Sequence, residues 1–179
     1  MKKTIITGVA GLFLALIINV AASGQTSIAK TTLPIDVTYH RRANLENDFK
    51  KVSRSEVNQK AVKNFTTNYK GSPDEQWFDV EGGFIAEFAS GDIDHRVDYD
   101  KKGNWLRTIR SYSEAEMAED LRHIVKSTYF DYEINLVQEI ERPASPVNYI
   151  IQLLGKTELI NLRINEGEMV VLQKFNRSK

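Results

Sequence analysis

An internal duplication constrains the fold of this chain more than any other feature of its sequence. In two stretches, 83–106 and 147–170, apolar residues occupy alternate positions and a polar, glycine-containing turn follows. The matching apolar residues lie 65 positions apart and are Phe84, Ala86 and Phe88 in the first copy and Tyr149, Ile151 and Leu153 in the second. Because repeated sequence usually means repeated architecture, one structural unit is expected twice.

A sequence signature of a helix start precedes each copy in the chain. Ser53 with Glu56, and Ser113 with Glu116, have the Ser-x-x-Glu spacing of a capping box, whose two side chains satisfy free amides at the start of a helix. Apolar residues then recur on one helical face. They are Val57, Ala61, Val62, Phe65 and Tyr69 in the first helix and Met117, Leu121, Ile124, Val125 and Tyr129 in the second. The first helix is expected to end near 71–73, at Gly-Ser-Pro.

Short runs of aromatic and β-branched residues follow each predicted helix and indicate antiparallel meanders. The strands are expected at about 76–80, 84–89, 93–99 and 105–111, and then at about 132–141, 147–154, 157–164 and 169–175. Alternation gives each meander one apolar face for its helix to cover. The sequence therefore predicts an α+β fold of two tandem repeats, each of one helix plus a four-stranded antiparallel meander, with the helices packed on one face of a shared sheet.

The first 24 residues have the composition of a secretory signal peptide. Lys2 and Lys3 form a basic start, 5–20 is apolar, and 21–24 supplies the small residues that a signal peptidase requires. A retained membrane anchor is the alternative, but the apolar run is shorter than the roughly 20 residues that a spanning helix needs. We expect cleavage, a periplasmic or secreted protein and no stable membrane insertion afterwards.

The remaining chain divides into three parts at the expected helix starts. They are an N-terminal arm at 25–52, a first repeat at 53–111 and a second repeat at 112–179. Removing 24 of the 179 residues leaves 155, an ordinary length for one domain or for two small repeats that share a sheet. The sequence has no cysteine, which excludes both disulfides and a lipid anchor on an N-terminal thiol.

The charge balance argues against nucleic acid as a partner. The chain has 24 basic and 24 acidic residues, and loss of Lys2 and Lys3 with the leader leaves 22 basic against 24 acidic ones. A nucleic acid or an anionic membrane surface calls for a basic stripe that neutralises phosphates. We expect neither partner.

Two motifs carry a resemblance to a known family. A tryptophan strand, 76–80, precedes a short polar turn, and 99–105 reads Tyr-Asp-x-x-Gly-x-Trp. With these motifs the chain resembles, over about 56–174, the secreted bacterial PepSY-like, beta-lactamase-inhibitor-like (BLIP-like) proteins. The resemblance implies a tandem helix-plus-four-strand layout with a concave sheet, the face that holds the target enzyme in the inhibitor that gives the family its name. The chain departs from the family at 113–116, where a Leu-Pro pair often opens the second helix.

His95 lies between Asp94 and Asp98 in the sequence, which raises the question of a metal site. Alternation along a strand places Asp94 and Asp98 on one face and His95 on the other. The position that matches His95 in the second copy is Ile160, which is expected in the core. The segment 98–103 also lacks the ligand spacing and distal glutamate of a calcium loop. We therefore expect a half-buried structural histidine and no metal.

The sequence gives no signature of catalysis. It contains no cysteine and no Gly-x-Ser-x-Gly motif, and His40, His95 and His123 fall in the arm, a strand and a helix without a serine context. The glycine-containing segments 81–83 and 90–92 precede strands and not helices, so they indicate turns and not phosphate-binding loops. A non-enzymatic protein without a cofactor is expected.

The remaining candidate for a functional site is a surface on the sheet. Aromatic and arginine residues would be concentrated there, as protein interfaces favour, if they lie on the face that the helices leave free. The alternative places one or both tryptophans in the core. The predicted binding residues are Trp77, Asp79, Asp94, Arg96, Asp98, Trp105 and Arg107.

These observations together predict a secreted, non-enzymatic binding module, with protein or peptidase inhibition as one form of that role. Its expected partner is an unidentified envelope or extracellular protein or peptide. The alternative function is binding of a small ligand, a peptide or a cell-envelope glycan, with the sheet as a cradle.

Overall fold

The computed structural model describes residues 49–72 and 74–176 of the chain. The predicted signal peptide and residues 25–48 of the predicted arm lie outside the described residues. The two described helices, α1 (Gln59–Asn68) and α2 (Glu119–Thr128), fall short of the length and apolar character that a membrane crossing requires.

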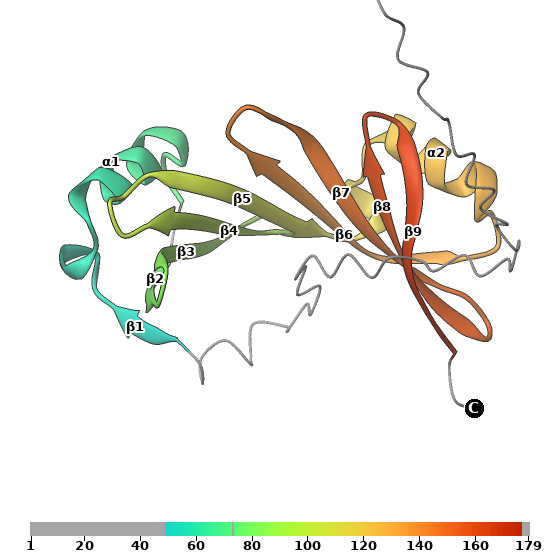
Figure 1. The fold of residues 1–179 in the computed structure, drawn as a ribbon, viewed down its shortest axis with the longest axis horizontal. Helices are drawn as coiled ribbons and strands as arrows, with labels where there is room; N and C mark the ends of the chain where they lie inside the picture. Colours follow the sequence, from blue (N-terminus) through green and yellow to red (C-terminus); the bar gives the residue numbers. More distant parts are fainter. Residues whose placement is uncertain (1–48, 73, 177–179) are drawn as a thin grey trace, which may run out of the picture. The chain divides into compact units, whose positions relative to one another are not determined.

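The described strands form one antiparallel sheet in which the spatial order follows the chain from β1 to β9 (Figure 1). Turns at glycine, asparagine and aspartate separate most of them, as hairpin connections require. The strands are β1 (Lys50–Val52), β2 (Gln76–Val80), β3 (Gly83–Ser90), β4 (Ile93–Asp100), β5 (Trp105–Tyr112), β6 (Glu133–Arg142), β7 (Ser145–Leu154), β8 (Glu158–Asn165) and β9 (Glu168–Asn176).

The predicted fold class, two tandem repeats of one helix plus a four-stranded meander, is wrong. The described residues form a single nine-stranded sheet with two helices. Two pairings produce it. Lys50–Val52, from the segment predicted as an arm, pairs with β2, and β5 pairs with β6 from Thr108 opposite Glu141 to Tyr112 opposite Val137. Backbone groups at the edges of β2 and β5 thereby gain partners, as buried amides and carbonyls require.

Each Ser-x-x-Glu motif begins a short 3₁₀ helix and not the α-helix that the spacing predicts. The carboxylate of Glu56 accepts a hydrogen bond from the amide of Ser53 at 2.8 Å, which caps η2 (Arg54–Glu56). Helix α1 begins only at Gln59, where the side chain of Asn58 accepts from the amide of Lys60 at 2.9 Å. The second motif caps η3 (Glu114–Glu116), ahead of α2.

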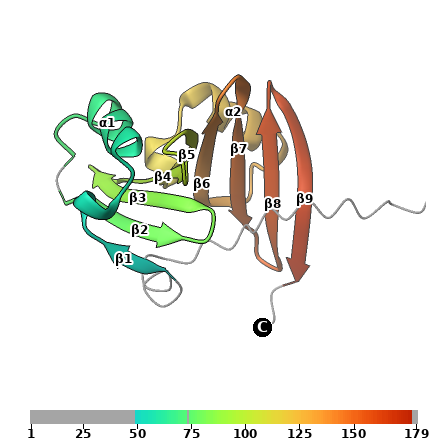
Figure 2. The same ribbon diagram turned by 60° about the vertical axis from the view of Figure 1, so that its left-hand side comes forward.

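Both helices pack against the same face of the sheet, which we call the helix side. Figure 2 shows strands β6 to β9 in front of α2. Aromatic residues dominate the core beneath α1, which contains Val57, Ala61, Phe65, Trp77, Ala86, Phe88, Val97 and Tyr99. Aliphatic residues dominate the core beneath α2, which contains Tyr112, Met117, Leu121, Val125, Ile134, Val137, Ile151, Leu153, Ile160, Leu162 and Ile164. Apolar area removed from water in these two clusters stabilises the fold.

The turn between β4 and β5 ties the sheet to the start of α1. The amide of Gly103 donates to the carbonyl of Asp100, and the side chain of Asn58 donates to the carbonyl of Lys101 at 3.1 Å. Gly103 has a φ of 77°, and a Cβ atom there would lie 2.7 Å from Oδ1 of Asn58 and 2.8 Å from the amide nitrogen of Ala61. Only glycine fits both that backbone conformation and that close approach.

Candidate functional site

The face opposite the helices, which we call the free side, carries an ion-pair cluster on β4 and β5. Asp98 is 7% exposed, and its carboxylate accepts from Nε of Arg96 at 2.8 Å and from Nε of Arg107 at 2.5 Å. The arginine side chains are 28% and 38% exposed, respectively. One buried carboxylate thus positions two partly exposed guanidinium groups, with a local net charge of +1.

Apolar side chains adjoin this cluster on the free side. Ile85 lies opposite Asp98 and Phe78 opposite Ile85 across neighbouring strands, and both apolar residues are buried. On the other flank, Ile109 lies opposite Arg96 and Ile140 opposite Ile109. Ile109 is the partly exposed member of this apolar set, and an apolar side chain beside arginines is a combination that protein interfaces favour.

A β-bulge places the predicted partners Trp105 and Arg107 on different faces. Trp105 pairs with Tyr99, whereas Arg107 pairs with Asp98, so Leu106 is the extra residue in β5. The indole of Trp105 consequently packs against the core beneath α1 on the helix side, and Arg107 stays on the free side. The alternation that groups Trp105 with Arg107 is therefore wrong.

The other predicted binding residues are also divided between the two faces. Trp77 is 2% exposed and stacks on Tyr99 in the core, so it belongs to the helix side. Asp79, two positions further along β2, is exposed. Asp94, Arg96 and Asp98 share the free side of β4. The structure thus brings together Arg96, Asp98 and Arg107, has Asp94 on the same side of the sheet, and separates them from Trp77, Asp79 and Trp105.

His95 lies on the helix side, away from Asp94 and Asp98. Its ring stacks on that of Phe88 with 4.5 Å between centroids, and Nδ1 lies 3.2 Å from the carbonyl oxygen of Ile93. Burial lowers the pKa of His95. The ring therefore takes part in the packing beneath α1.

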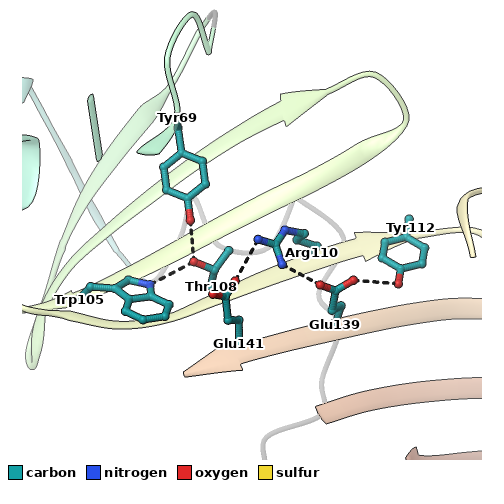
Figure 3. Close-up of polar contacts among 7 residues, drawn as sticks. All are labelled: Tyr69, Trp105, Thr108, Arg110, Tyr112, Glu139 and Glu141. Carbon is teal, nitrogen blue, oxygen red and sulfur yellow. Dashed lines mark hydrogen bonds and ion pairs between the residues drawn. The ribbon is translucent and has the colours of Figure 1, made fainter. Parts of the chain in front are cut away.

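A polar network that sequence reasoning missed crosses the helix side between the two apolar cores (Figure 3). Its first part centres on Thr108, which is fully buried on β5. Nε1 of Trp105 donates to the hydroxyl of Thr108 at 3.1 Å, and the hydroxyl of Tyr69 lies 2.7 Å from the same oxygen. These contacts fix the Trp105 indole against the sheet. Burial raises the pKa of Tyr69.

The second part of the network centres on Arg110, which bridges two carboxylates of β6. Its Nη1 donates to Glu139 at 2.7 Å and its Nη2 to Glu141 at 3.0 Å. The hydroxyl of Tyr112 also donates to Glu139, at 3.2 Å. Burial alone would lower the pKa of Arg110, but the hydrogen bond and charge of Glu141, together with Glu139, raise it. Glu139 and Glu141 alternate in the sequence, yet only the β5–β6 register reveals that they face Arg110.

A hollow of about 280 Å³ opens beside this network, between α1 with the residue that follows it and the β5–β6 pair. Polar and aromatic side chains line it, namely Asn64, Asn68, Tyr69, Trp105, Arg110 and Glu141. Asn64 Oδ1 accepts from the hydroxyl of Tyr99, and Asn68 Nδ2 donates to the carbonyl of Asn64. Within the part of the chain that the structure describes, Asn64 Nδ2 and Asn68 Oδ1 have no hydrogen-bond partner, so both are available to a ligand.

No protein-family model matches the chain, and no curated protein matches it either. Solved structures do. A DUF2874 family protein from Bacteroides ovatus is similar with a TM-score of 0.56 and 17% identity, covering 67% of this chain and 87% of its own. A protein from Bacteroides eggerthii, named for an expected periplasmic location, is similar with a TM-score of 0.54 and 17% identity, covering 67% of this chain and 88% of its own.

A BLIP-like protein from Bacteroides fragilis is similar with a TM-score of 0.54 and 17% identity, covering 67% of this chain and 86% of its own. At these identities the likeness is one of fold alone. It supports the BLIP-like part of the resemblance seen in the sequence and not the PepSY-like part. The chain has a BLIP-like fold.

Proposed function

We propose that the protein is a secreted or periplasmic, non-enzymatic binding module that holds a protein or peptide partner against the free side of its sheet. The observation that carries the proposal is the cluster of Arg96, Asp98 and Arg107. The BLIP-like fold is consistent with such a role, and the name of the Bacteroides eggerthii neighbour is consistent with the location. Inhibition of an envelope or extracellular enzyme is one form that this binding takes.

The chemistry of the cluster favours a partner that offers carboxylate or carbonyl oxygens. A guanidinium has five N–H donors, and the bond from Arg107 to Asp98 uses one of them. Because Asp98 fixes the direction of the side chain, little conformational entropy remains to be lost when a partner binds. Arginine is also enriched among the residues that dominate binding energy at interfaces.

The test is capture of a partner by the mature chain and by a variant with a single change. In Arg107→Gln the exposed charge is lost, while Asp98 keeps its bond to Arg96 and the sheet keeps its register. We expect the unchanged protein to retain a partner from an envelope extract and, once that partner is purified, to form a stoichiometric complex with it. Arg107→Gln is expected to weaken that complex at least tenfold.

The matched control is Arg122→Gln on α2, where the arginine also pairs with a carboxylate, Glu114, at 2.7 Å. This variant is expected to bind as the unchanged protein does. Equal affinity of the purified partner for Arg107→Gln and for the unchanged protein would show that the free side is not the binding surface.

A further inference from the structure

We propose that the hollow between α1 and the β5–β6 pair binds a neutral saccharide unit. This site is distinct from the surface under the proposed function, because it lies on the helix side of β5. Its volume of about 280 Å³ lies near the lower end of the range of small-molecule pockets, roughly 300–1,000 Å³. A single small ligand is therefore the class that it fits.

The lining favours a ligand that both donates and accepts hydrogen bonds. Asn64 supplies a free Nδ2 donor, and Asn68, one helical turn later, supplies a free Oδ1 acceptor. Glu141 uses Oε2 for Arg110, and Oε1 has no partner among residues 49–72 and 74–176. A hydroxyl group can accept from Asn64 and donate to Asn68 or Glu141, so neighbouring hydroxyls of a sugar match this set.

The charge of the site disfavours an anion. Arg110 is the only cation among the described residues that line the hollow, and two of its five N–H donors are bound to Glu139 and Glu141. One positive and two negative groups leave the cluster with a net charge of −1. A phosphate or carboxylate would meet this net negative charge, because Glu139 and Glu141 already offset the charge of Arg110, whereas a neutral polyhydroxylated ligand has no charge to be repelled.

The Trp105 indole supplies the apolar part of the site. Its ring is half-buried, and its Nε1 bond to Thr108 holds it in one orientation. The face of an aromatic ring carries negative charge density and attracts the positively polarised C–H groups of a sugar ring. A fixed ring beside free carboxamides is thus complementary to the apolar and polar edges of one saccharide.

The test is titration of the mature chain with glucose, galactose, mannose and N-acetylglucosamine, with tryptophan fluorescence as the measure of binding. The chain has two tryptophans, and Trp77 is 2% exposed within the core, so a change in emission on binding reports on Trp105. We expect at least one of these sugars to shift the emission with saturation. Glucose 6-phosphate is expected to bind more weakly than glucose.

Two variants locate the binding. Asn64→Asp keeps an oxygen for the hydroxyl of Tyr99 and removes the free donor, and Asn68→Ala removes the free acceptor. Each is expected to weaken saccharide binding at least fivefold while thermal melting confirms the fold. Asn176→Ala, on exposed β9, is the matched control and is expected to leave binding unchanged.

Three results would overturn the proposal. The first is the absence of any saturable shift with all four sugars at about 10 mM, tenfold above a Kd of 1 mM. The second is binding by the Asn64→Asp and Asn68→Ala variants that is as tight as binding by the unchanged protein. The third is tighter binding of glucose 6-phosphate than of glucose. None of them bears on the Arg107 surface, so failure here and failure of the proposed function are distinguishable.

Discussion

Trp105 and Arg107 lie on opposite faces of β5. The indole of Trp105 donates to Thr108 on the helix side, while the guanidinium of Arg107 donates to Asp98 on the free side. One strand therefore contributes to two separate surfaces, each held by its own polar contacts. A side-chain substitution on one surface leaves the hydrogen bonds of the other in place, and the experiments on them are independent.

The ion pairs of Asp98 are expected to stabilise the fold. Asp98→Ala leaves two arginines without their shared carboxylate and should lower the free energy of unfolding by about 1–3 kcal/mol. Asp94→Ala, an exposed position on the same side of β4, should change it by less than about 0.5 kcal/mol. Urea denaturation of both variants checks this, and equal values for the two would contradict a stabilising role for the cluster.

Burial, and not residue type, should decide the effect of valine truncation. Val125 on α2 is fully buried, so Val125→Ala removes two methyl groups from a packed core and should lower the free energy of unfolding by about 2–3 kcal/mol. Val171 on β9 is 40% exposed, and Val171→Ala should have an effect below about 1 kcal/mol. Thermal or urea unfolding measures both; a larger loss at Val171 would contradict the assignment of α2 to the core.

Gly103 should tolerate alanine less well than Gly91. Both have a positive φ, of 77° and 60°, so each Gly→Ala change places an L-residue in the left-handed region at a cost of about 1–2 kcal/mol. At Gly91 the new Cβ meets no atom of the described residues within 4 Å, whereas at Gly103 it meets Asn58 and the backbone of Ala61. Gly103→Ala should therefore lower the melting temperature further, and equal melting temperatures would show that the turn does not pack closely on α1.

Acid should destabilise the protein in part through His95. Burial lowers the pKa of His95 from the usual 6.5, so the unfolded chain binds more protons than the folded one as the pH falls below about 6.5. The free energy of unfolding should then decrease with falling pH in this window, before the carboxylates titrate. His95→Phe keeps a ring against Phe88 and removes the titration, so it should flatten this part of the profile.

His123→Phe is the control for that measurement, since His123 lies exposed on α2. Its stability profile should keep the slope of the unchanged protein between about pH 6.5 and 5. A slope that disappears in His123→Phe and persists in His95→Phe would show that the effect does not come from His95.

The positions of individual strands could be predicted because their ends are marked locally. Glycine, asparagine and aspartate interrupt the apolar runs, and the expected strand at 76–80 matches β2 residue for residue. The starts of the helices could not be predicted as well from the sequence. A Ser-x-x-Glu spacing caps a 3₁₀ helix as well as an α-helix, and the residue that caps α1 is Asn58, five positions after Ser53.

The fold class and most of the candidate sites depend on register, which local patterns do not contain. Nothing near Lys50 indicates that it pairs opposite Asp79 and extends the sheet. The bulge at Leu106 inverts the face of Trp105, and the pairing of Glu139 with Arg110 joins segments 29 positions apart. These relationships arise from long-range pairing, so alternation alone assigned Trp105 to the wrong surface.

The strand order of the sheet also bears on how the chain folds. Every strand from β2 to β9 pairs with the strand that precedes it, so no pairing requires two ends of the chain to meet. The longest connections that must close are those that contain α1 and α2, and loop-closure entropy grows only slowly with their length. Such a sheet can grow in one direction, hairpin by hairpin, because each strand pairs with strands that are its neighbours in the sequence, and such local pairings favour fast folding.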